Sequence, residues 1–136
     1  MKKMDNRVKE ILCNSVIHID IGKRRSAGDE DLYEKNLRAF VNDHDYGSIV
    51  SALQNSNFYL AERYSQRLKI KSYNLGMVRL AKYCDTLCVA MQSGRGAPDY
   101  TEEMKDVTTL YGMMKECVGR AFLETSARTE KARPKN

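Results

Sequence analysis

Residues 80–91, "LAKYCDTLCVAM", have the spacing of an amphipathic helix. Four apolar side chains recur at steps of four, three and four residues, which places them on one stripe: Leu80, Cys84, Leu87 and Met91. Two glycines and a proline in "SGRGAP" (93–98) then end the helix. Most of the stability of such a helix comes from packing its stripe against other elements, so the stretch predicts a helical bundle.

The neighbouring segments carry two longer helices. The earlier one begins after Ser56 or Asn57, which are both acceptable N-caps, and Gly76 marks the turn that follows it. The later one begins at a candidate capping box formed by Asp99 and Glu102. Their buried sides are formed by Ala61, Tyr64 and Leu68, with Leu75 beyond the helix end, and by Met104, Val107, Tyr111, Met114 and Val118, through about Leu123.

Three shorter helical segments are expected nearer the N-terminus. The first covers residues 5–13, and a connector over 14–28 leads to the second, over 29–42, whose acidic start suits a helix N-terminus. The sequence "HDYG" (44–47) is expected to break this helix before a short third segment. The apolar stripes are Val8, Ile11 and Leu12; Tyr33, Leu37 and Phe40; and Ile49, Ala52 and Leu53.

These stripes predict an all-α fold, because the strict alternation of a strand is almost absent. Short loops between amphipathic helices favour an antiparallel four-helix bundle with an additional short N-terminal helix packed as a lid. We expect an N-terminal helix within 1–16, the bundle within 17–124, and a basic, disordered tail over 125–136, where no apolar period remains.

Composition limits the class of protein. The chain has 136 residues, of which 42% are apolar and 30% charged, enough for one globular domain. No run approaches the roughly 20 apolar residues of a membrane span, and the first residues lack a signal-peptide core, so we expect a cytoplasmic protein. The four cysteines have no CxxC spacing and are expected to be reduced and buried.

The helix that follows Asn57 also has a distinct outer side. At 100° per residue, Gln66 lies 200° from Leu68, so Gln66 is expected to face solvent if Leu68 is buried. The exposed strip is Arg63, Gln66, Lys69, Ile70 and Tyr73, with Arg67 and Glu62 at its edges. A cationic strip around a central residue suits a phosphoryl-transfer surface, but exposed helix faces are also charged simply for solubility.

The segment "QRLKIKSYNLG" (66–76) resembles the motif of the histidine phosphotransfer (HPt) family, His-x-Leu-Lys-Gly-Ser-Ser-x-x-Leu-Gly. The matching frame is Gln66, Leu68, Lys69, Ser72, Leu75 and Gly76. Residues 19–40 are similar to the Gly-rich and acidic-Tyr segment that precedes the family's bundle. Asn57 and Phe58 lie where the family has Asp and an aromatic residue, and Leu80, Leu87 and Gly94 keep its downstream spacing. The resemblance covers residues 17–123.

The resemblance implies an antiparallel four-helix bundle that exchanges phosphoryl groups with receiver domains or kinases, yet the reacting residue is missing. Gln66 replaces the phospho-accepting histidine, and an amide nitrogen lacks the available lone pair of an imidazole. Ile70 replaces the glycine that lets the partner backbone approach, and Lys71 replaces the first serine. We therefore expect phosphotransfer to be lost.

Other chemistry finds little support in the sequence. His18 and His44 lack the Leu-Lys frame and are expected to be ordinary surface residues. Cys84 and Cys88, one turn apart, would need Cys13, Cys117 or a histidine to complete a zinc site, but small thiols in an apolar stripe are typical of a core. Paired carboxylates, Ser-His-Asp order and a phosphate loop are missing, so we expect no enzyme, no metal and no cofactor.

The functional expectation is a pseudo-phosphotransfer module of a two-component phosphorelay. It would bind a receiver domain of a response regulator, or a histidine kinase, as a scaffold or a competitor. The predicted partner-binding residues are Arg63, Gln66, Arg67, Lys69, Ile70 and Tyr73; the structural motif residues are Leu68, Ser72, Leu75 and Gly76. The alternative is a bundle with an unrelated role, such as nucleic-acid or other protein binding through its basic face, which the net charge of +5 permits.

Overall fold

The structure is a computed structural model that describes residues 6–14, 17–94 and 100–132, with side chains for 6–12, 17–94 and 100–122. Throughout this part of the chain, the regular elements are helices, which confirms the predicted all-α class. They are α1 (Asn6–Asn14), α2 (Ile19–Arg25), α3 (Glu30–Phe40), α4 (Asp45–Gln54), α5 (Phe58–Asn74), α6 (Val78–Ser93) and α7 (Thr101–Ala132).

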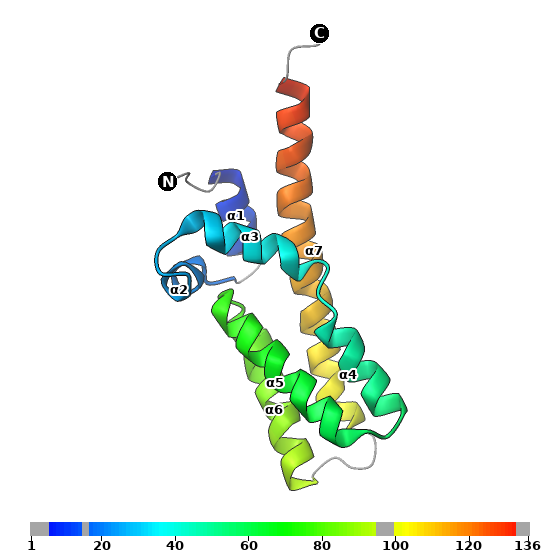
Figure 1. Ribbon diagram of the computed structural model, residues 1–136. Coiled ribbons are helices and arrows are strands. Elements are labelled where there is room, and N and C mark those ends of the chain that lie inside the picture. The colour runs from blue at the N-terminus through cyan, green and yellow to red at the C-terminus, as the bar shows by residue number, and fades with distance from the viewer. Residues whose placement is uncertain (1–5, 15–16, 95–99, 133–136) are drawn as a thin grey trace.

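The lower part of the molecule is an antiparallel bundle of α4, α5, α6 and the first half of α7 (Figure 1). α5 lies between α4 and α6, and α6 packs on α7. Tyr46 of α4 closes the bundle, because its ring stacks on Tyr111 of α7 with centroids 4.4 Å apart. The Tyr46 hydroxyl also donates a hydrogen bond to Thr108 Oγ1 at 2.9 Å.

The upper part is formed by α1, α2 and α3 around the continuing α7 (Figure 1). α1 packs against α7 and buries Val8 and Leu12 completely. One continuous core joins the two parts, and its largest fully buried side chains are Tyr33, Phe40, Leu12, Leu37, Ile49, Leu68, Met77, Leu80, Leu87, Val8, Val107 and Val118. The short N-terminal helix is therefore part of the core.

α3 begins at the predicted acidic start, and α5 is capped by Asn57, one of its two predicted caps. Asp29 caps α3 by accepting a hydrogen bond from the Leu32 N–H at 3.1 Å, and Asn57 caps α5 by accepting one from the Leu60 N–H at 3.2 Å. Gly94 ends α6 with a φ of +74°, a conformation that glycine adopts without strain. Asp99 of the predicted capping box lies outside the described residues.

Two expected helix boundaries near the N-terminus are wrong. The connector 14–28 contains α2, which has an acidic first turn and a basic last turn, so its charges complement the helix dipole. The sequence 44–47 does not break a helix, because α4 begins at Asp45, whose N–H donates to Asp43 Oδ2 at 3.0 Å. The two helices are instead separated by the short turn over residues 41–44.

The predicted end of the last helix, near Leu123, is also wrong. α7 continues to Ala132 and so includes most of the segment predicted to be a disordered tail. Residues 125–132 are rich in Ala, Arg, Glu and Lys, which favour a helix, and contain no glycine or proline. Separately, among the helices that the structure describes, each is too short or too polar to cross a membrane.

Candidate functional site

The predicted partner-binding residues lie along the outer side of α5, and we call them the α5 strip: Arg63, Gln66, Arg67, Lys69, Ile70 and Tyr73. Ile70 is 57% exposed and Tyr73 39% exposed, as the helical wheel predicts. Gln66 is half-buried, so the expectation that it faces solvent is only partly correct. The apolar part of the strip is therefore accessible at Ile70 and Tyr73, one and two turns beyond Gln66, and Arg63 and Arg67 are exposed as well.

Gln66 belongs to a hydrogen-bond network that joins α5 to α6. Its Nε2 lies 3.4 Å from Glu62 Oε1, and Gln92 Nε2 of α6 donates to the same oxygen at 2.9 Å. The Glu62 carboxylate thus holds two amide groups at the position where the HPt motif has its histidine. An amide in this network can donate and accept hydrogen bonds but has no nucleophilic nitrogen.

The strip is less cationic than the sequence suggests. Lys69 Nζ lies 3.2 Å from Asp85 Oδ1, and Arg67 Nε lies 3.6 Å from Asp45 Oδ1. Arg63 donates to the Tyr59 hydroxyl at 3.0 Å. Two of the three positive charges are therefore paired with carboxylates from α4 and α6, which a wheel drawn for α5 alone cannot show.

A groove of about 670 Å³ runs beside Ile70 and Tyr73. Its opposite wall consists of Val78 and Ala81 at the start of α6, and Arg25 of α2 reaches its upper end. The Arg25 guanidinium lies 4.3 Å from the centroid of the Tyr73 ring. Sequence reasoning missed these three lining residues, although the three-residue step from Val78 to Ala81 places both on neighbouring positions of one helix side, at the edge of the buried stripe.

The motif residues on the inner side of α5 are buried. Leu68 and Ser72 are fully buried, and the Ser72 hydroxyl has no hydrogen-bond partner in the described part of the chain. The Leu75 carbonyl accepts a hydrogen bond from the Tyr33 hydroxyl at 2.8 Å. Gly76 has a φ of +82°, and its carbonyl accepts from the His18 N–H at 2.8 Å. The frame therefore joins α5 to α2 and α3.

Lys71 does not belong to the outer strip. Its ammonium donates hydrogen bonds to Asp43 and, at 2.7 Å, to Asp45 Oδ2, and so ties α5 to the start of α4. Burial alone would lower the pKa of Lys71, but the hydrogen bonds and charges of the two carboxylates outweigh it and raise that pKa above 10.5. At the position of the motif's first serine, this chain thus has a structural ion pair.

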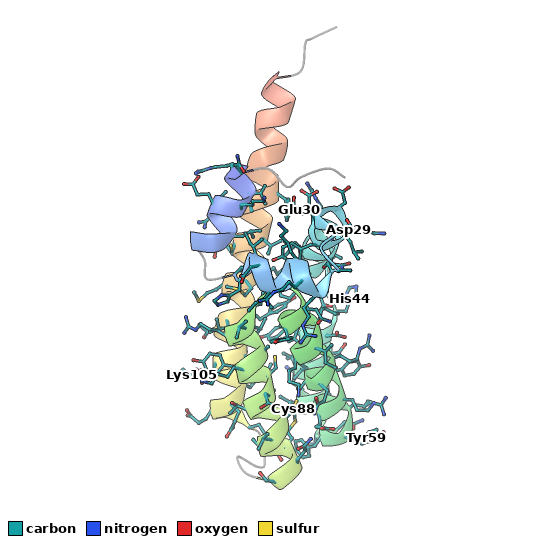
Figure 2. All side chains as sticks on the ribbon, turned by 90° about the vertical axis from the view of Figure 1, so that its left-hand side faces the viewer. Asp29, Glu30, His44, Tyr59, Cys88 and Lys105 are labelled. Atoms are coloured by element: carbon teal, nitrogen blue, oxygen red, sulfur yellow. The ribbon has the colours of Figure 1, made fainter. Side chains whose placement is uncertain are left out.

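The three cysteines whose side chains the structure describes lie in the core. Cys84, Cys88 and Cys117 are buried, and burial is the main cause that raises the pKa of Cys84 and of Cys88 to about 12, so both thiols are protonated at neutral pH. Figure 2 shows Cys88 on α6 and His44 where α4 begins. Among the described residues, no group of three or more potential metal ligands occurs.

Comparison with protein-family models, with curated proteins and with solved structures found no match to this chain. The resemblance to the HPt family therefore rests on the sequence features described above alone. Leu68, Ser72 and Gly76 are buried in the α5 frame, and Gln66 and Ile70 lie on its outer side.

Proposed function

We propose that this chain is an HPt-like binding module that docks a receiver domain of a response regulator, or a histidine kinase, without transferring phosphate. The observation that carries the proposal is the exposure of Ile70 beside an apolar groove, one turn from the position of the missing histidine. A partner that covers Ile70 removes apolar surface from water. Because Ile70 is 57% exposed, its complete burial contributes about 1–2 kcal/mol to binding.

Loss of transfer follows from the chemistry of Gln66. Its amide is hydrogen-bonded through Glu62 and offers no nucleophile to a phosphoryl donor. A module that docks without reacting acts as a competitor of a competent transfer protein, or as a scaffold for its partner. Such a role belongs in the cytoplasm, where receiver domains are found.

The paired charges argue against the rival role in nucleic-acid binding. A phosphate backbone is bound by accessible Lys and Arg, whereas Lys69 and Arg67 already lie beside Asp85 and Asp45. Salt titration separates the two roles. Binding of a DNA or RNA oligonucleotide that weakens linearly with log[salt], together with no receiver binding, contradicts the proposal.

The test uses purified receiver domains and kinase domains encoded in the same genome, titrated against the full chain by calorimetry. We expect at least one of them to bind. Ile70→Asp should then weaken binding at least about tenfold, which corresponds to about 1.4 kcal/mol, because it places a charge where the partner excludes water. Thermal stability should barely change.

Val89→Asp is the matched control, because Val89 is 52% exposed on α6 and does not line the groove. It should leave the dissociation constant within about twofold of that of the unmodified chain. Equal effects of the two variants would contradict docking at the α5 strip. Incubation with a phosphorylated receiver should leave no acid-labile phosphate on the chain, and label on His18 or His44 would contradict the loss of transfer.

A further inference from the structure

A second cavity, of about 280 Å³, lies where α2, α3 and the C-terminal end of α5 meet. Figure 1 shows these three segments converging in the upper part of the molecule. The apolar part of the cavity is formed by Leu32, Ala39 and Phe40 of α3 and by Leu75 after α5. Leu32 is 42% exposed here, so part of this apolar surface faces water.

The charges around the cavity leave one cation uncompensated. Lys71 and Asp43 line it, and Lys71 is hydrogen-bonded to both Asp43 and Asp45. Arg67 lies beside the same Asp45, so two cations balance two carboxylates in this cluster. Arg25 also lines the cavity, and the contact that the structure gives its guanidinium is the Tyr73 ring. No described carboxylate lies within ion-pair distance of Arg25.

Two side-chain amides accompany Arg25 in the lining. Asn36 comes from α3 and Asn74 from the last turn of α5. Within the described part of the chain, neither amide has a hydrogen-bond partner in the protein. The cavity thus combines a guanidinium with two groups that can donate hydrogen bonds, next to an apolar surface.

The walls of the cavity are held in place by contacts outside it. The Tyr33 ring of α3 packs directly on Gly22 of α2, where even a methyl side chain would collide with it. The Tyr33 hydroxyl donates to the Leu75 carbonyl at 2.8 Å and so fixes α3 against the end of α5. A cavity with fixed walls loses little conformational entropy when a ligand binds.

We propose that this cavity binds a small organic carboxylate with a compact apolar body. A guanidinium matches a carboxylate with two parallel hydrogen bonds, Asn36 and Asn74 donate to the remaining lone pairs, and the apolar body covers Leu32 and Ala39, the exposed apolar residues of the lining. The volume of 280 Å³ lies just below the range of about 300–1,000 Å³ that is usual for ligand pockets, so the ligand is small. The cavity shares Arg25 and Asn74 with the groove beside Ile70, but the proposal does not rest on the proposed docking function.

Benzoate is the test ligand, because it joins one carboxylate to a compact apolar ring. It is titrated into the ¹⁵N-labelled full chain while backbone and side-chain amide signals are recorded. We expect saturable shifts that are concentrated at Asn36, Asn74 and the end of α2. Benzamide, which has nearly the same shape without the charge, should bind at least about fivefold more weakly. Equal affinities, or shifts spread evenly over basic residues, would overturn the proposal.

Two variants separate the two halves of the site. Arg25→Gln removes the uncompensated charge and should weaken benzoate binding at least about fivefold. Arg24→Gln should change it less than about twofold, because Arg24 lies beside Asp20 and does not line the cavity. Ala39→Leu keeps every polar group but fills the apolar part, and should abolish saturation. Benzoate binding that survives either Arg25→Gln or Ala39→Leu unchanged, in variants whose spectra remain native, would overturn the assignment.

Discussion

The inner and the outer side of α5 differ in what constrains their residues. On the inner side, Leu68 and Ser72 are fully buried, and the Gly76 turn beyond the helix holds the start of α2. On the outer side, Ile70 and Tyr73 are partly exposed, and Arg25 packs on the Tyr73 ring. Any sequence that keeps this packing needs the inner residues, with or without phosphotransfer. The inner half of the motif therefore supports the fold, and the outer half is the part on which the proposed docking depends.

Leu68→Ala tests the inner side and should have the largest effect. Leu68 is fully buried on the side of α5 that faces the core, so the change removes apolar contacts and leaves a cavity. We expect the free energy of unfolding to fall by about 2–5 kcal/mol, measured by urea denaturation. Ile70→Ala is the outer-side control and should cost less than about 0.5 kcal/mol. Equal losses of unfolding free energy in the two variants would contradict the difference between the inner and the outer side.

Gly76→Ala should rank next. The residue has a φ of +82°, which costs a non-glycine residue about 1–2 kcal/mol, and the added Cβ would collide with the His18 carbonyl oxygen. We expect a loss of at least about 2 kcal/mol, measured in the same way. Gly47→Ala is the control, because a Cβ at Gly47 meets no other atom within 4 Å and its φ is not positive. A Gly76→Ala protein as stable as the control would contradict the close approach of α2.

Lys71→Met tests the side of α5 that faces α4. Because Lys71 is more than a third exposed, solvent weakens its ion pairs, and we expect a loss of about 1–2 kcal/mol at pH 7. The folded pKa of Lys71 is raised above 10.5, so its contribution is fully present below that pH and is lost as the pH rises through the folded value. The stability difference between the unmodified chain and Lys71→Met should be constant from pH 7 to 9 and shrink above about pH 10.5. A difference that grows with pH would contradict the raised pKa.

Local sequence signals predicted the fold well where one residue determines the geometry. Asp29 and Asn57 mark helix starts because the oxygen of each side chain accepts a hydrogen bond from the free N–H group three residues later. Gly94 marks a helix end because it adopts a positive φ. α2 was missed because a helix of seven residues is too short to show a recognisable apolar period. Its signal was the change from Asp20 to three successive basic residues, which matches the helix dipole.

The candidate site was predicted less completely, because its properties depend on neighbouring helices. Exposure of Ile70 follows from the period of α5 alone. The pairing of Lys69 with Asp85 does not, because Asp85 comes from α6 and lies 16 residues away in sequence. The hydrogen bonds around Gln66 likewise include Gln92 of α6, which donates to the Glu62 carboxylate that Gln66 also contacts. The period of one helix predicts which of its residues are exposed, but not which charged groups of neighbouring helices pair with them.

The smallest effect is expected for Gln66→His on the outer side. The change supplies an imidazole at the motif position, but Ile70 stands one turn away and limits how closely a partner backbone can approach. The Glu62 carboxylate, 3.4 Å from the present amide, would also hold the imidazole through a hydrogen bond. We expect at most a trace of acid-labile phosphate after incubation with a phosphorylated receiver that binds the chain.

Adding Ile70→Gly to Gln66→His should raise this signal more than either change alone, because it removes the obstructing side chain. Its cost is about 1 kcal/mol of stability for a glycine within a helix, so the fold should survive. The matched control combines Gln66→His with Val89→Gly, which has the same glycine cost on α6 and leaves Ile70 in place. Efficient transfer by Gln66→His alone would show that Ile70 does not obstruct the partner. The loss of phosphotransfer would then be due to Gln66 alone.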